Sequence, residues 1–172
     1  MRTFLIIFLT VFIVKANGQS FISYKDTVNH FSIDIPVGWK YGVNKSYPAI
    51  ILLAYRTPAG PKDTSRDNFN INVIETPTKT LDKSFTDFLK YLPDAENYKL
   101  IDTGATTING LKFKWLVETH KHDKIDIQMH NYDFVTLKNG KTYILTLVTF
   151  SYAFDTVKPL FDKIASSFKL LN

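Results

Sequence analysis

The chain has 172 residues, of which 45% are hydrophobic, 15% aromatic and 22% charged, and this balance excludes a disordered or collagen-like chain. It contains no cysteine, which excludes disulfides, thiolate nucleophiles, zinc ribbons and iron–sulfur ligation. The net charge of +5 is too small to indicate a nucleic-acid-binding protein.

The N-terminal segment has the features of a secretory signal peptide. Arg2 is followed by an apolar run over residues 4–14, which Lys15 ends well short of the ~20 residues that a membrane-spanning helix needs. Ala16 and Gly18 are small residues of the kind that a signal peptidase accepts, so we expect cleavage after Gly18. This predicts a signal peptide at 1–18, a single domain at 19–172 and a periplasmic or secreted location. The alternative is an uncleaved membrane anchor, whereas a lipid anchor is excluded because no cysteine follows the run.

Strands dominate the first part of the mature chain. Short runs rich in Val, Ile, Thr, Phe and Tyr predict four strands, over residues 21–24, 30–35, 49–55 and 69–74. The first two form a hairpin, and the third is apolar throughout, as expected of a central strand. Residues 57–68 have the composition of an exposed loop, with two prolines, one glycine and several polar residues.

Two later stretches show helical spacing. Apolar residues recur at intervals of three and four from Leu81 to Leu92, after a capping residue at Thr80 or Asp82 and before Pro93. A second apolar stripe covers 153–168, where Pro159 is tolerable only in the first turn. Four strand-like runs lie between these helices, and the Asn109-Gly110 and Asn139-Gly140 pairs are favoured hairpin turns.

This order of elements predicts an α+β fold. We expect a single antiparallel sheet of about six to seven strands, flanked by helices on both faces. A β-sandwich is the alternative, and the apolar stripes of the two helical segments count against it.

Three segments resemble the PsbP-like family. Residues 31–39 (FSIDIPVGW) match its strand and Pro-Gly-Trp turn, residues 139–147 (NGKTYILTL) match its late hairpin, and residues 161–168 match its closing helix and final phenylalanine. The resemblance spans about 21–170. It implies the α/β/α sandwich shared by photosystem II PsbP and a Ran-binding protein, here in a secreted bacterial member of unknown function. Because members perform unrelated tasks and share mainly the binding of other macromolecules, it implies a binding role and no particular reaction.

One hairpin carries a cluster of metal-ligand residue types. With a turn near His122 or Asp123, Glu118, His120 and Asp126 would lie on the face opposite Val117, and His130 would lie there too. Imidazole and carboxylate ligands suit zinc or another divalent metal. The competing interpretation is a solvated hairpin tip, because no strict motif such as HExxH is present.

The sequence contains no catalytic motif of the GxSxG, GxGxxG or P-loop kind. It therefore predicts a non-enzymatic binding module without a cofactor, which engages a protein partner in the cell envelope through one sheet face or the 57–68 loop. Four residues in and beside that loop are the candidate partner-binding residues: Tyr55, Arg56, Lys62 and Arg66. The alternative is a small-ligand or divalent-metal carrier that uses the hairpin from Glu118 to His130. A hydrolytic enzyme would require a pocket with converging carboxylates or histidines of perturbed pKa.

Overall fold

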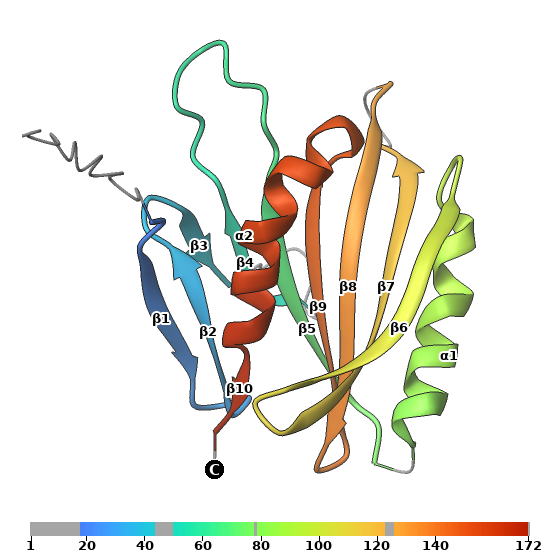
Figure 1. Ribbon diagram of the computed structural model, residues 1–172. Coiled ribbons are helices and arrows are strands. Elements are labelled where there is room, and N and C mark those ends of the chain that lie inside the picture. Colours follow the sequence, from blue (N-terminus) through green and yellow to red (C-terminus); the bar gives the residue numbers. More distant parts are fainter. Residues whose placement is uncertain (1–17, 44–49, 78, 123–125, 172) are drawn as a thin grey trace, which may run out of the picture.

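The computed structural model describes residues 18–43, 50–77, 79–122 and 126–171 (Figure 1). The predicted signal peptide therefore lies almost entirely outside the described residues. Within the described residues, no helix is long and apolar enough to cross a membrane.

Seven strands form one antiparallel sheet in the order β3-β4-β5-β9-β8-β7-β6. These strands are β3 (Lys40–Gly42), β4 (Ile50–Tyr55), β5 (Asn68–Glu75), β6 (Lys99–Ile108), β7 (Leu111–Lys121), β8 (Gln128–Lys138) and β9 (Lys141–Phe150). Both predicted Asn-Gly turns are confirmed, because Asn109, Gly110, Asn139 and Gly140 all have positive φ.

A second, three-stranded sheet was not predicted. It has the order β1-β2-β10 and consists of β1 (Phe21–Asp26), β2 (Phe31–Pro36) and β10 (Lys169–Leu170). β10 has two residues, which is too short for a recognisable sequence pattern. The prediction of a single sheet was therefore wrong, although the larger sheet has the expected number of strands.

The two helices are α1 (Leu81–Tyr91) and α2 (Phe154–Ser167), and the short 3-10 turns η1 (Leu92–Asp94) and η2 (Ser151–Ala153) adjoin them. Thr80 caps α1 as predicted, since its side chain accepts a hydrogen bond from the Lys83 amide at 3.2 Å. The prediction for Pro159 was wrong, because α2 begins at Phe154 and this proline lies in its second turn.

The large sheet buries one face against α2 and β2, which lie beside each other over it (Figure 1). Phe113, Val117 and Phe134 of the sheet belong to this core together with Phe161 of α2 and Ile33 of β2. Most of the hydrophobic stabilisation of the fold comes from this cluster.

α1 packs on a separate and smaller cluster. Its Phe85 contacts Leu116, Val135 and Ile144, which alternate along their strands with residues of the main core. Because this cluster lies on β7, β8 and β9 alone, α1 leaves β4 and β5 uncovered. The prediction that helices flank both faces is thus not confirmed for the whole sheet. The part over β4 and β5 has no covering from α1.

Gly104 of β6 makes a close approach that a larger residue could not make. It pairs with Trp115 of β7, and a Cβ atom at Gly104 would lie 2.5 Å from Cζ2 and 2.7 Å from Cε2 of the indole ring. We expect Gly104→Ala to lower the free energy of unfolding by about 1–3 kcal/mol, because the ring must shift out of its packing against Tyr132. Urea titration checks this value. Gly42→Ala is the control, since no described atom beyond its two chain neighbours lies within 4 Å of its added methyl group, and equal losses in the two variants would contradict the explanation.

Candidate functional site

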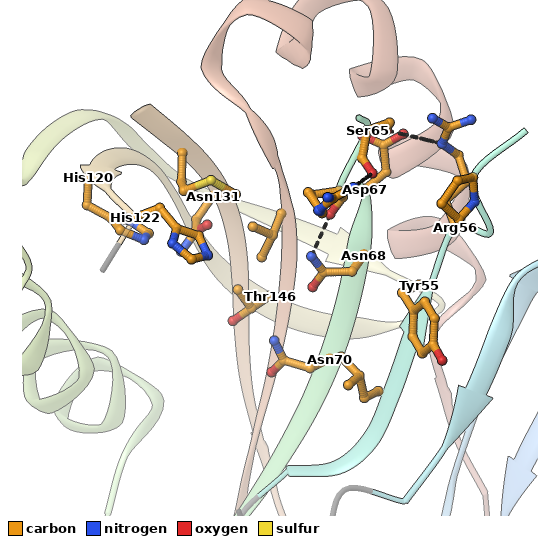
Figure 2. Close-up of a pocket in the computed structure, with 15 residues that line it drawn as sticks. Tyr55, Arg56, Ser65, Asp67, Asn68, Asn70, His120, His122, Asn131 and Thr146 are labelled. Atoms are coloured by element: carbon orange, nitrogen blue, oxygen red, sulfur yellow. Dashed lines mark hydrogen bonds and ion pairs between the residues drawn. The ribbon is translucent and has the colours of Figure 1, made fainter. Parts of the chain in front are cut away.

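An open pocket of about 710 Å³ lies between the β4–β5 loop and the part of the sheet that α1 leaves uncovered (Figure 2). The loop covers residues 57–67 and extends beyond the upper ends of the strands in Figure 1. Figure 2 shows His120 and His122 on one side of the pocket, with Tyr55 and Arg56 on the other. Strands that are far apart in the sequence therefore build a single site.

Arg56 fixes the loop to the sheet. Its guanidinium contacts Asp63 Oδ1 at 2.6 Å (Nη2) and Asp67 Oδ2 at 3.0 Å (Nε), and its Nε donates to Ser65 Oγ at 3.1 Å. Asp63 also accepts hydrogen bonds from the backbone amides of Ala59 and Ser65. These amide bonds, followed by the Arg56 contact, lower the pKa of Asp63 to about 2.

Asp67 continues this network below the loop. It is 6% exposed and accepts a hydrogen bond from Thr149 Oγ1 at 2.6 Å, in addition to its ion pair with Arg56. Asp67 and Arg56 thus compensate each other's charge, and the loop is held in one conformation beside the sheet.

We expect Arg56→Met to lower the free energy of unfolding by about 2 kcal/mol, because it leaves the buried Asp67 carboxylate without its cation. The loop should also open, so the amides of Ala59 and Ser65 should exchange with deuterium at least about tenfold faster. Lys62→Met, which removes a positive charge from the same loop, should change neither quantity. Unchanged exchange at Ala59 and Ser65 in the Arg56 variant would show that this network does not hold the loop.

The floor of the pocket carries amide and hydroxyl groups beside apolar side chains. Asn70 pairs with Thr146 across β5 and β9, and Asn68 and Asn131 both lie opposite Val148. Asn70 Oδ1 accepts a hydrogen bond from Asn72 Nδ2 at 2.8 Å. Leu53, Met129 and Val148 add apolar surface to the same pocket. Such a mixture is typical of sites that bind by shape and hydrogen bonding.

Two carboxyl groups lie beneath this floor, and both are only 1% exposed. Asp133 Oδ1 accepts a hydrogen bond from Thr146 Oγ1 at 2.5 Å, whereas its Oδ2 has no partner among the described residues. Burial raises the pKa of Asp133 to about 7, with a smaller contribution from the charge of Glu118. Glu118 in turn contacts His120 Nδ1 at 3.1 Å through both of its oxygens.

Neither buried carboxyl lines the pocket, although their partners Thr146 and His120 do. A raised carboxyl pKa close to a histidine is one of the features expected of a hydrolytic enzyme. Glu118 and Asp133 are covered by their own partners, so they support the floor from below and do not themselves face the pocket.

The predicted metal ligands are brought together only in part. Glu118 and His120 are in contact, but Asp126 is 93% exposed and pairs with Lys121 Nζ at 3.2 Å. Across residues 18–43, 50–77, 79–122 and 126–171, no three or more His, Asp or Glu residues are placed to hold a metal ion. Residues 123–125 of the hairpin lie outside the described residues. The metal site stays a prediction, which elemental analysis of natively purified protein and of His120→Ala tests.

The predicted register of this hairpin was wrong. Its turn is longer than expected, since the His122 amide donates to the Ile127 carbonyl and His120 pairs with Met129. His130 therefore faces the main core, where its ring stacks on Phe154 at 3.6 Å between centroids. Burial lowers the pKa of His130, and this half-buried histidine lies on the face of the sheet opposite Glu118.

The structure also places the four predicted partner-binding residues. Tyr55, Arg56 and Arg66 all line the pocket, while Lys62 is exposed on the loop outside it. Three residues of the floor, Asn70, Asn131 and Thr146, were not predicted, nor was Asp133 beneath it. Their one visible signal was a polar residue at every second position of otherwise apolar strands, as at Asn70 and Asn72 or Asn131 and Asp133.

The chain belongs to the PsbP family, whose model matches residues 19–170. Its fold is similar to that of cyanobacterial PsbP (CyanoP) from Synechocystis sp. PCC 6803, with 24% identity, a TM-score of 0.66, and coverage of 91% of this chain and 95% of that one. This confirms the resemblance found in the sequence.

Two further solved structures share the fold. LpqN of Mycobacterium tuberculosis, which is involved in cell envelope biogenesis, is 13% identical with a TM-score of 0.61 and coverage of 92% of this chain and 95% of LpqN. PA94 of Pseudomonas aeruginosa, a protein of unknown function, is 14% identical with a TM-score of 0.59 and coverage of 87% and 96%. No curated protein matches the chain.

Proposed function

We propose that this protein is a secreted, non-catalytic binding module that holds a protein partner of the cell envelope. The partner is bound in the pocket between the 57–67 loop and the uncovered end of the sheet. The observation that carries the proposal is this pocket of about 710 Å³, which lies on the α1 face of the sheet beside the strands that α1 leaves uncovered. Loops fixed on a rigid sheet are common binding elements.

Further support comes from the way the pocket is built. Arg56, Asp63 and Asp67 hold the loop in place before any partner arrives, so little conformational entropy is lost on binding. Tyr55 is 44% exposed at the rim, and tyrosine is enriched at interfaces because it combines apolar area with a polar tip. The envelope role of LpqN and the apolar N-terminal segment agree with an envelope location.

Site-specific photocrosslinking in the host cell tests the proposal. A photoreactive phenylalanine analogue at Tyr55 should give one defined crosslinked protein, which mass spectrometry identifies. The same analogue at Tyr91, which is 75% exposed but lies on α1 outside the pocket, is the control. The proposal is wrong if Tyr55 yields no adduct or if both positions yield the same set of adducts.

A further inference from the structure

The charges around the pocket are unbalanced in a way that specifies the chemistry of its occupant. Among the described residues that line it, Asp67 is the single carboxylate, and Arg56 and Thr149 already occupy that carboxylate. Glu118 and Asp133 are buried beneath the floor. Among the residues that the structure describes, the pocket therefore presents no accessible negative group to a ligand.

Arg66, in contrast, is a charged residue of this pocket that remains accessible. It is exposed at the pocket, and its Nη1 donates to the backbone carbonyls of Thr64 and Ser65 at 3.0 Å each. None of the ion pairs in the described part of the chain involves Arg66. Its Nε and Nη2 groups make no hydrogen bond there, so one edge of the guanidinium remains available. That edge is the fork that binds a carboxylate with two parallel hydrogen bonds.

The surface next to this cation is apolar and amide-rich. Leu53, Val148 and Met129 line the same pocket as Tyr55. Asn131 and Thr146 add polar surface beside them. An occupant that matches these groups needs a carboxylate and an adjacent apolar side chain. An extended peptide containing Asp or Glu beside an apolar residue has both.

We infer that the pocket binds an acidic segment of its protein partner, with a side-chain carboxylate received by Arg66 and a neighbouring apolar side chain placed on Leu53, Met129 and Val148. This inference rests on the proposed function, because it names the chemistry of the partner at the same pocket. Arg56 does not serve as a second receptor for the carboxylate, since its guanidinium is occupied by Asp63 and Asp67.

A selection from random short peptides displayed on phage, with the purified protein as bait, tests the inference. We expect the selected peptides to be enriched in Asp and Glu and depleted in Lys and Arg. Synthetic copies should bind at least about tenfold more weakly to Arg66→Ala than to the parent protein, and glutamine replacement of their acidic residues should cause a similar loss. Lys163→Ala removes an exposed charge on α2, away from the pocket, and should leave the affinity unchanged.

Amide chemical shifts measured during peptide titration test separately whether the pocket binds a partner and whether the bound segment is acidic. Peptides that shift the amides of Asn70, Asn131 and Thr146 but carry no acidic enrichment, or that bind Arg66→Ala normally, would overturn the inference and leave the proposed function intact. If no peptide is selected, or if the selected peptides shift other amides only, both the proposed function and the inference are overturned.

Discussion

Replacing Asp133 by asparagine should stabilise the protein at alkaline pH and remove the loss of stability that this carboxyl causes as the pH rises from 4 to 7. The folded-state pKa of this carboxyl is about 7, whereas the unfolded chain has the ordinary value near ~4. The folded state thus binds the proton more tightly. The stability from this group is fully present below about pH 4 and is lost as the pH rises through about 7.

A shift of roughly three pKa units corresponds to an upper bound of about 4 kcal/mol between acidic and alkaline conditions. Asparagine has nearly the same shape, its carbonyl can accept the hydrogen bond from Thr146, and it carries no charge at any pH. We therefore expect Asp133→Asn to gain about 2–4 kcal/mol over the parent protein at pH 8–9, and little at pH 4.

Urea titrations from pH 4 to 9 measure this difference. Asp126→Asn is the control, because Asp126 is 93% exposed and its removal should shift the curve little at any pH. Parallel pH profiles for the parent protein and Asp133→Asn would contradict the assignment of a neutral, buried carboxyl beneath the pocket.

The second large effect concerns Phe168, the residue after α2. Its side chain is fully buried, stacks on Phe31 of the small sheet at 5.8 Å, and meets Phe113 and Tyr143 of the large sheet edge-on at 5.7 and 6.0 Å. One ring therefore joins both sheets at the end of α2. We expect Phe168→Ala to lower the free energy of unfolding by about 3–5 kcal/mol, through lost burial and the cavity left behind.

That loss is a large share of the ~5–15 kcal/mol by which a domain is stable, so the unfolding midpoint in urea should fall markedly. Phe88→Ala on α1 is the matched control, because Phe88 is only half-buried at the smaller cluster and should cost less than half as much. A loss below about 1 kcal/mol for Phe168→Ala would mean that the core can close around the missing ring.

Most of the helices, strands and turns could be predicted from residues that act on their own part of the backbone. Thr80 and Pro93 mark the ends of α1, and the two Asn-Gly pairs specify their turns, because each of these residues acts on its own backbone. Pairings that depend on distant residues could not be predicted. β10 pairs with β2 across most of the chain, and no local feature of Lys169 and Leu170 indicates this.

Less of the candidate site could be predicted from the sequence, because most of it depends on which distant strands pair and in which register. Three of the four predicted partner-binding residues, Tyr55, Arg56 and Arg66, line the loop side of the pocket, because loop composition is visible in the sequence. Their role in binding a partner stays a prediction. The metal prediction depended on the register of the β7–β8 hairpin, which loop length fixes. A longer loop placed Met129 opposite His120 and turned His130 to the other face. The buried position of Asp133 depends on the pairing of β8 with β7 and β9 and has no counterpart in local pattern.

In the proposed complex, a partner occupies the space between the 57–67 loop and the uncovered sheet face. Hydrogen–deuterium exchange of the protein, alone and with the partner identified by photocrosslinking, measures this occupancy directly. Binding should slow exchange in residues 57–67 and at the amides of Asn68, Asn70 and Asn131, while α2 should exchange at the same rate in both samples. Protection confined to α2 or to the β1-β2-β10 sheet, with no change at the loop, would contradict the claim.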